Sequence, residues 1–133
     1  MRTAAAPGLA HRARPRTREV VMFVALSVLL LIGCLLPAAA KLAGHPRMRE
    51  SARHFQIPWQ RYRLIGVAEL AAAAGVLAGL WWHSLGLAAA AGMAVLLVGA
   101  LIVHRRAGDH SKEIAPALAT LLIAVAYLLA GLV

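Results

Sequence analysis

The sequence predicts an all-α fold, a transmembrane four-helix bundle with a short interfacial helix in the first loop. Three observations predict it. Of the 133 residues, 62% are hydrophobic and only 14% are charged. The apolar residues gather in four runs, at 20–40, 64–82, 84–103 and 114–133. A helix of about 20 apolar residues crosses a bilayer, and a soluble domain has about a quarter charged residues, so this composition excludes an ordinary soluble fold.

The chain divides into a basic arm, residues 1–19, and a four-helix transmembrane domain, residues 20–133. The arm, the first run and the small residues at its end also match the pattern of a secretory signal peptide, and residues 31–34 resemble a lipoprotein lipobox. The run is longer than a usual signal core and continues past Cys34, so we expect the helix to be retained. Because Cys34 is the single cysteine, the chain has no intramolecular disulfide, and we expect a buried core residue there.

The loop between the first two runs contains a shorter helical pattern. Met48, Ala52 and Phe55 recur at helical spacing with arginines on the other side, which predicts a helix over 47–55 lying in the membrane interface. A solvated basic loop is the alternative. Pro58 ends this helix because proline disfavours helical geometry at the residue before it. We expect aromatic anchors at both ends of the second membrane helix, and these are Trp59, Tyr62, Trp81 and Trp82.

The formal charge of +9 comes from basic residues that flank the apolar runs. We therefore expect contacts with anionic lipid headgroups and no nucleic-acid partner. The arginines expected at headgroups are Arg47, Arg49, Arg53, Arg105 and Arg106. The arginine-rich arm predicts cytoplasmic N- and C-termini in the plasma (inner) membrane of a bacterium, whereas the larger number of basic residues in the loops favours the opposite orientation.

Glu69 is the single formal charge inside the predicted spans. A carboxylate at that depth is costly unless it is paired, protonated or facing a wet cavity. Alternating helix directions bring it to the same membrane face as Lys41, which ends the first helix, and His104, which follows the third. We therefore predict a ligand or partner site of Lys41, Glu69 and His104, with an ion pair between the first two. In the structural alternative, Lys41 extends to headgroups and Glu69 only holds helices together.

No motif identifies a catalytic residue or a metal centre. Glu69, His104, Asp109 and His110 carry nitrogen and oxygen ligands, but their spacing matches no zinc or iron pattern. The sequence has no glycine-rich phosphate loop, nucleophile elbow or His-Glu-x-x-His motif. We therefore predict no catalytic and no metal residues, and a non-enzymatic role is favoured over an enzyme.

The chain resembles the DoxX-like family of small four-helix membrane proteins from about residue 25 to residue 130. The segments that carry the resemblance are Lys41-Leu42-Ala43-Gly44, Phe55-Gln56-Ile57-Pro58-Trp59, Gly66-Val67-Ala68-Glu69-Leu70, Gly75 with Gly79, Leu85-Gly86, Gly99-Ala100 with His104, Gly108-Asp109 and Pro116-Ala117. The name-giving members look like subunits linked to quinone-dependent sulfur oxidation, others resemble parts of redox-protective membrane complexes, and similar animal proteins act as receptor-assembly chaperones. The resemblance marks Lys41, Glu69 and His104 as the polar positions to test and assigns them no reaction.

Two functions remain open at this point. The first is a non-enzymatic partner, scaffold or accessory subunit of a membrane complex, which binds lipids and a protein partner, has no cofactor of its own and is compatible with homo-oligomerisation. The second is a subunit of a quinone-linked oxidoreductase in which Glu69 and His104 bind a quinone headgroup or relay protons. A transporter is less well supported, because the four runs show no evident repeat and supply little polar lining.

Overall fold

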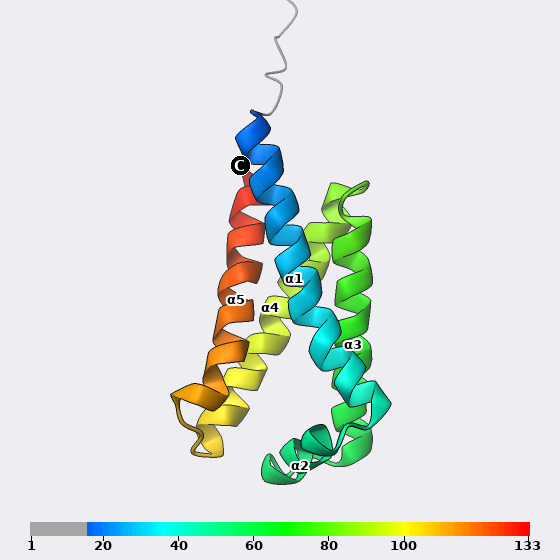
Figure 1. The fold of residues 1–133 in the computed structure, drawn as a ribbon, viewed down its shortest axis with the longest axis vertical. Coiled ribbons are helices and arrows are strands. Elements are labelled where there is room, and N and C mark those ends of the chain that lie inside the picture. Colours follow the sequence, from blue (N-terminus) through cyan, green and yellow to red (C-terminus); the bar gives the residue numbers. More distant parts are fainter. Residues whose placement is uncertain (1–15) are drawn as a thin grey trace, which may run out of the picture.

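The computed structural model describes residues 16–133, which form five helices and no strand (Figure 1). The helices are α1 (Thr17–Ala43), α2 (Pro46–His54), α3 (Trp59–Ala78), α4 (His83–Arg106) and α5 (Ser111–Leu132). The predicted all-α fold is confirmed, with α2 as the predicted short helix between the first two long ones. Most of the predicted arm, residues 1–15, lies outside the described residues.

The long helices have the length and composition of membrane spans. Within residues 16–133, α1, α4 and α5 are long and apolar enough to cross a membrane. The fourth, α3, has 20 residues and carries Arg61, Arg63 and Glu69. It lies antiparallel to α1 and α4 and packs against both (Figure 1). The chain is therefore a multi-pass integral membrane protein, in which α3 completes the bundle.

Local interactions explain why helix ends differ from the predicted boundaries. α1 begins at Thr17 because the side chain of Glu19 accepts a hydrogen bond of 3.3 Å from the Arg16 backbone N–H. It ends at Ala43 because the next residue, Gly44, has a φ of 71°, the left-handed conformation that glycine adopts readily. α3 ends at Ala78, four residues before the predicted end, because the chain turns over residues 79–82. Trp81 and Trp82 therefore lie in an exposed turn before α4.

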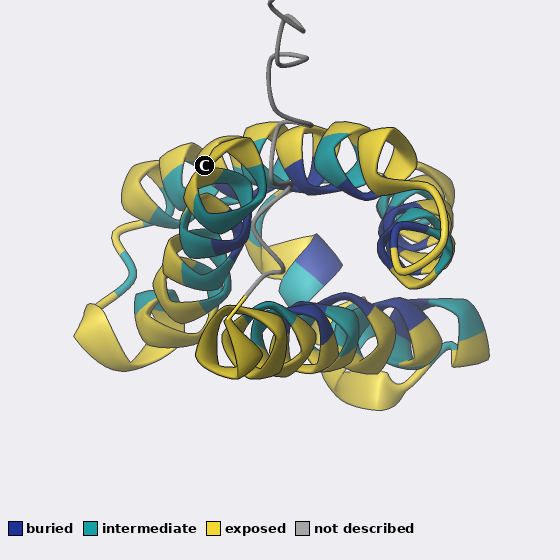
Figure 2. Cartoon of the chain, turned by 90° about the horizontal axis from the view of Figure 1, so that it is seen from above, coloured by how far each residue is buried: buried dark blue, intermediate teal, exposed yellow. Residues whose placement is uncertain are grey.

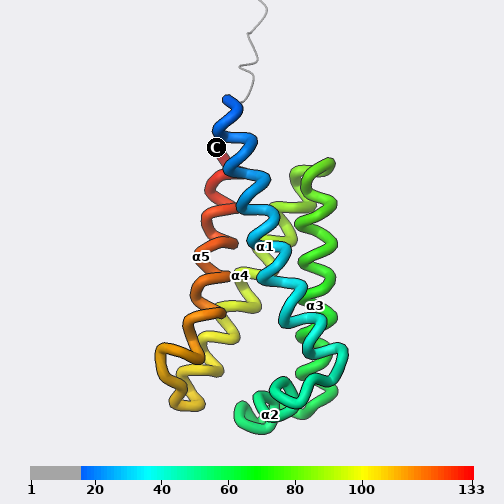
Figure 3. The backbone as a smooth tube through the Cα atoms, viewed as in Figure 1, coloured from blue at the N-terminus to red at the C-terminus, as the bar shows by residue number. Residues whose placement is uncertain are grey.

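The bundle consists of two helix pairs that meet at one end and diverge toward the other. α1 packs most extensively along α3, and α4 along α5. At the end that holds the α3–α4 turn, Gly79 and Gly86 lie so close that a Cβ on either would clash with the Cα of the other. Toward the opposite end the pairs separate, and α2 lies across the gap (Figures 1 and 3). The sequence therefore builds a wedge with its narrow end at two glycines.

The buried residues face the axis of the bundle, and its outer surface is apolar. Seen from above, the four long helices stand around a common axis, and the dark blue buried segments lie on the sides that face it (Figure 2). The largest fully buried side chains are Tyr127, Leu30, Met93, Val76 and Cys34. The prediction of a buried Cys34 is thus confirmed. Exposed leucines, valines and isoleucines cover the outside, as expected where lipid replaces water.

Candidate functional site

A cavity of about 700 Å³ lies between the two helix pairs, where they diverge. All five helices contribute to its wall. At the loop end, which is the end of the bundle that holds α2 and the α4–α5 loop, the wall is formed by α2 and the residues after it. Most lining side chains are apolar, including Leu36, Ile65, Met93 and Leu97. The polar side chains in the lining are Lys41, Ser51, Tyr62, Glu69, His104, Glu113 and Thr120. An apolar cavity with a few polar groups is typical of a site for a small lipophilic ligand.

Lys41 and Glu69 form a buried ion pair in the wall of this cavity. The Nζ atom of Lys41 lies 3.0 Å from both carboxylate oxygens of Glu69. Lys41 is 6% exposed and Glu69 is 7% exposed. Gly66, one turn before Glu69, lets the helices approach, because a Cβ there would press against the Lys41 side chain. The predicted ion pair is therefore present, and it joins α1 to α3.

Tyr62 completes the surroundings of Lys41. Its ring centroid lies 5.2 Å from the Lys41 ammonium, a cation–π arrangement. Tyr62 is buried and lines the cavity. Its position at i−7 from Glu69 puts both side chains on the same face of α3. We expect Tyr62 from the sequence only as an interfacial anchor. Its helical spacing from Glu69 is the signal in the sequence that places it in the site.

His104 lines the same cavity, but Asp109 is its hydrogen-bond partner. The His104 Nδ1 atom lies 2.6 Å from Asp109 Oδ2. The His104 ring meets the Phe55 ring edge-on, with centroids 4.9 Å apart. Lys41, Glu69 and His104 therefore line one cavity, while His104 belongs to a separate polar cluster with Asp109. Their role as a ligand or partner site stays a prediction.

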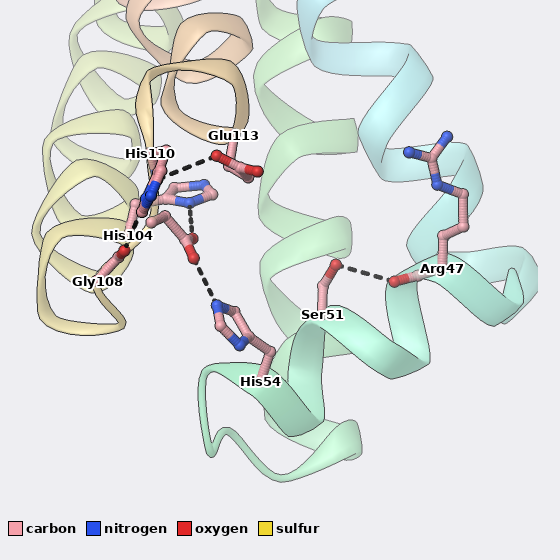
Figure 4. A network of polar contacts seen from close by, with 8 residues as sticks. Arg47, Ser51, His54, His104, Gly108, His110 and Glu113 are labelled. Carbon is pink, nitrogen blue, oxygen red and sulfur yellow. Dashed lines mark hydrogen bonds and ion pairs between the residues drawn. The ribbon is translucent and has the colours of Figure 1, made fainter.

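Asp109 also binds His54, at the end of α2, and the sequence analysis missed this link. Asp109 Oδ1 lies 2.5 Å from His54 Nε2, so one carboxylate accepts from two imidazoles (Figure 4). Hydrogen bonds from His54 and from His104 hold the pKa of Asp109 below its ordinary value. Within residues 16–133, no group of three or more His, Cys, Asp or Glu side chains is arranged as metal ligands.

Residues 25–127 match the family model described as DoxX-like family. The chain belongs to the DoxX-like family. The match covers most of the chain, and the resemblance noted from the sequence is thereby confirmed. No curated protein and no solved structure matches the chain.

The five arginines expected at headgroups lie on α2 and at the end of α4 in this DoxX-like protein. Arg47, Arg49, Arg53, Arg105 and Arg106 are all exposed. Arg49 stacks on Trp59, with its guanidinium carbon 4.7 Å from the ring centroid, and its Nε donates to the Gly44 carbonyl at 3.4 Å. Contacts of these arginines with lipid headgroups, and anchoring by Trp59, Tyr62, Trp81 and Trp82, stay predictions.

Proposed function

We propose that this DoxX-like protein is a non-enzymatic accessory subunit or scaffold of a membrane complex, and that its cavity binds a lipophilic molecule for that complex. The observation that carries the proposal is the apolar cavity of about 700 Å³ with a buried ion pair in its wall. Ionisable residues inside a membrane protein are costly and commonly mark ligand pathways. Apolar walls and few polar groups suit a hydrocarbon body with one polar end.

The charges of the site favour a ligand with an uncharged head. Lys41 and Glu69 neutralise each other at 3.0 Å, so the site offers an ionised headgroup little net attraction. The Lys41 ammonium has three N–H donors, of which the carboxylate oxygens take two, so one donor is left for a ligand. We therefore expect an alcohol or carbonyl group at the polar end of the ligand.

A non-catalytic role is supported by the chemistry of the available side chains. The single cysteine, Cys34, is buried and has no second thiol in the chain with which to form a redox pair. The polar groups of the cavity are engaged with each other, Lys41 with Glu69 and His104 with Asp109. They are arranged to hold a ligand and not to attack one.

A quinone-linked subunit is the second candidate, and the lining of the cavity favours it. A quinone carries two carbonyl oxygens on an apolar body. One of them can accept a hydrogen bond from the Lys41 ammonium, and the His104 imidazole lines the same cavity. The apolar residues of α1, α4 and α5 fit the ring and its chain. When bound, a quinone would accept electrons and protons that a partner enzyme supplies.

Native mass spectrometry of protein extracted in mild detergent tests ligand binding. Ala100 lines the cavity, and Ala91 is exposed on the same helix outside the lining, so they form a matched pair. We expect wild-type protein and Ala91→Phe to retain a lipophilic molecule, and Ala100→Phe to lose it because the ring projects into the cavity and obstructs the ligand. Equal retention by both variants, or a wild-type protein without any bound lipophile, contradicts the proposal.

Crosslinking in native membranes tests the role as an accessory subunit. We expect the wild-type chain to crosslink reproducibly to one other protein, and the Ala91→Phe variant to crosslink to it at the same level. Recovery of only the bare chain after crosslinking contradicts the accessory role.

Added decylubiquinone separates the two candidates, since displacement of the endogenous lipophile favours a quinone site and no displacement favours another lipophile.

A further inference from the structure

The short helix α2 forms the wall of the cavity at its loop end. Met48 and Ser51 from α2, and Phe55 immediately after it, line the cavity. The chain connects α2 to α1 through Gly44 and to α3 through Pro58, and α2 packs against these two helices. Both lie on one side of the wedge, so α2 is built on the α1–α3 pair.

The structure joins α2 to the other helix pair through two side chains. His54 Nε2 lies 2.5 Å from Asp109, in the loop between α4 and α5. Phe55 lies edge-on against His104 on α4. Figure 4 shows His54 reaching across from α2 toward His104 at the end of α4 and the loop that carries His110. This bridge closes the gap that the diverging pairs would otherwise leave open.

Asp109 is placed to hold both histidines at once. Its side chain is only 8% exposed although it lies in a loop, and each carboxylate oxygen accepts from a different imidazole. Gly108 has a φ of 74°, which turns the short loop back toward α4. Hydrogen bonds to an ionised carboxylate are the stronger kind, so one residue joins α2 to α4.

The same carboxylate fixes the orientation of His104. Because Asp109 accepts from Nδ1 at 2.6 Å, that nitrogen carries the proton. The second ring nitrogen, Nε2, is then left for a ligand at the loop end of the cavity. Asp109 therefore acts on the site through two neighbours.

We propose that α2 is a strap that closes the loop end of the cavity, and that Asp109 is the positioning residue that fastens the strap through His54 and orients His104. A lipophilic ligand then reaches the cavity from the bilayer between the diverging helices. This inference rests on the proposed function only for the ligand inside the cavity. Closure of the strap is measured independently, as access of a reagent to the cavity wall.

Cysteine labelling measures that access directly. Val103 lines the cavity on α4, so Val103→Cys in a Cys34→Ala background places one thiol behind the strap. Full-length protein in lipid nanodiscs is reacted with a water-soluble, membrane-impermeant maleimide. We expect slow labelling with the strap intact and about threefold to tenfold faster labelling in Asp109→Asn, the change expected from a weakened charge-assisted hydrogen bond.

His54→Ala and His110→Ala form the matched comparison. The His54 side chain is 49% exposed, so its replacement leaves the core intact while it unfastens the strap. His110 is in the same loop as Asp109, and its ring Nδ1 lies 3.3 Å from the carbonyl oxygen of Gly108 in that loop. We expect faster labelling with His54→Ala and an unchanged rate with His110→Ala. Equal rates in all variants overturn the strap, and so does an acceleration by His110→Ala that equals the effect of His54→Ala.

Ligand retention in the same preparations separates this inference from the proposed function. Hexadecanol and decylubiquinone serve as probes, measured by native mass spectrometry. If both probes fail to bind while His54→Ala still accelerates labelling, the proposed function fails and the strap stands. If a probe binds but the labelling rate ignores His54 and Asp109, the strap fails and the proposed function stands.

Discussion

The ammonium group of Lys41 lies 3.0 Å from both carboxylate oxygens of Glu69, and the pair joins the end of α1 to the middle of α3. The two residues are 28 positions apart in the sequence. The pair is almost completely buried, so water contributes little to the stabilisation of its two charges. Lys41 also faces the ring of Tyr62, so one cation interacts with two neighbours in the cavity wall, Glu69 and Tyr62.

Removal of one partner is expected to cost more stability than removal of both. Glu69→Leu leaves the Lys41 charge buried without its partner, which costs about 3–5 kcal/mol, whereas the double variant Lys41→Met/Glu69→Leu leaves no buried charge and is close to neutral. Unfolding by denaturant in detergent measures the free energies of a double-mutant cycle. If the double variant loses as much stability as the sum of the single variants, the two side chains do not act as a pair.

The same double variant also separates stability from function. We expect it to keep the bundle folded but to remove the ion pair from the cavity wall, so retention of hexadecanol in native mass spectrometry should be weaker than in wild type. A folded double variant that retains hexadecanol normally would leave the pair with a structural role alone.

The narrow end of the wedge depends on Gly86. A Cβ at this position would run into the hydroxyl of Tyr127 and the Cα of Gly79. Gly86→Ala should therefore destabilise the bundle by about 1–3 kcal/mol, as overpacking does in tight cores. Gly92 on the same helix is the control, because an added Cβ there meets nothing within 4 Å. Thermal unfolding in detergent distinguishes the two, and an equal effect of both alanines would place the close contact elsewhere.

The fold was predictable because the signals for membrane helices are local. Run length and hydropathy locate the four long helices, and alternating helix direction was enough to bring Lys41 and Glu69 together. The link from His54 to Asp109 was not predictable, because it spans 55 positions and depends on how far α2 reaches across the wedge. The end of α3 was misplaced because the apolar run continues through the turn at residues 79–82, where hydropathy does not distinguish a helix from a turn.

Closure of the strap is expected to depend on pH in the acidic range. Hydrogen bonds from His54 and His104 lower the pKa of Asp109, so the carboxylate stabilises the closed state above the ordinary Asp range of about 4. This contribution is lost as the pH falls through the lowered pKa. His54 faces Asp109 from α2 and His104 faces it from α4, while His110 and Glu113 lie at the start of α5 (Figure 4).

Distances between spin labels measure this closure without the pH dependence of thiol chemistry. Glu50 on α2 and Lys112 on α5 are both exposed, so cysteines there in a Cys34→Ala background carry nitroxides on opposite sides of the strap. We expect one narrow distance distribution from pH 7 to about pH 5 and a longer, broader one only below the ordinary Asp range. Asp109→Asn should show the broad distribution throughout. An opening between pH 7 and pH 5 that persists in Asp109→Asn would assign the change to another group.

The ring of Tyr62 is expected to matter more than its hydroxyl group. The ring centroid lies 5.2 Å from the Lys41 ammonium, whereas the hydroxyl donates to the Met48 sulfur at the long distance of 3.9 Å. Tyr62→Phe keeps the π face and should leave stability nearly unchanged, while Tyr62→Leu should lose about 1–2 kcal/mol from the cation–π contact in addition to any packing change. Denaturant unfolding of both variants in the wild-type and Lys41→Met backgrounds isolates the contact. If Tyr62→Leu costs the same in both backgrounds, the ring stabilises α3 by packing and not through Lys41.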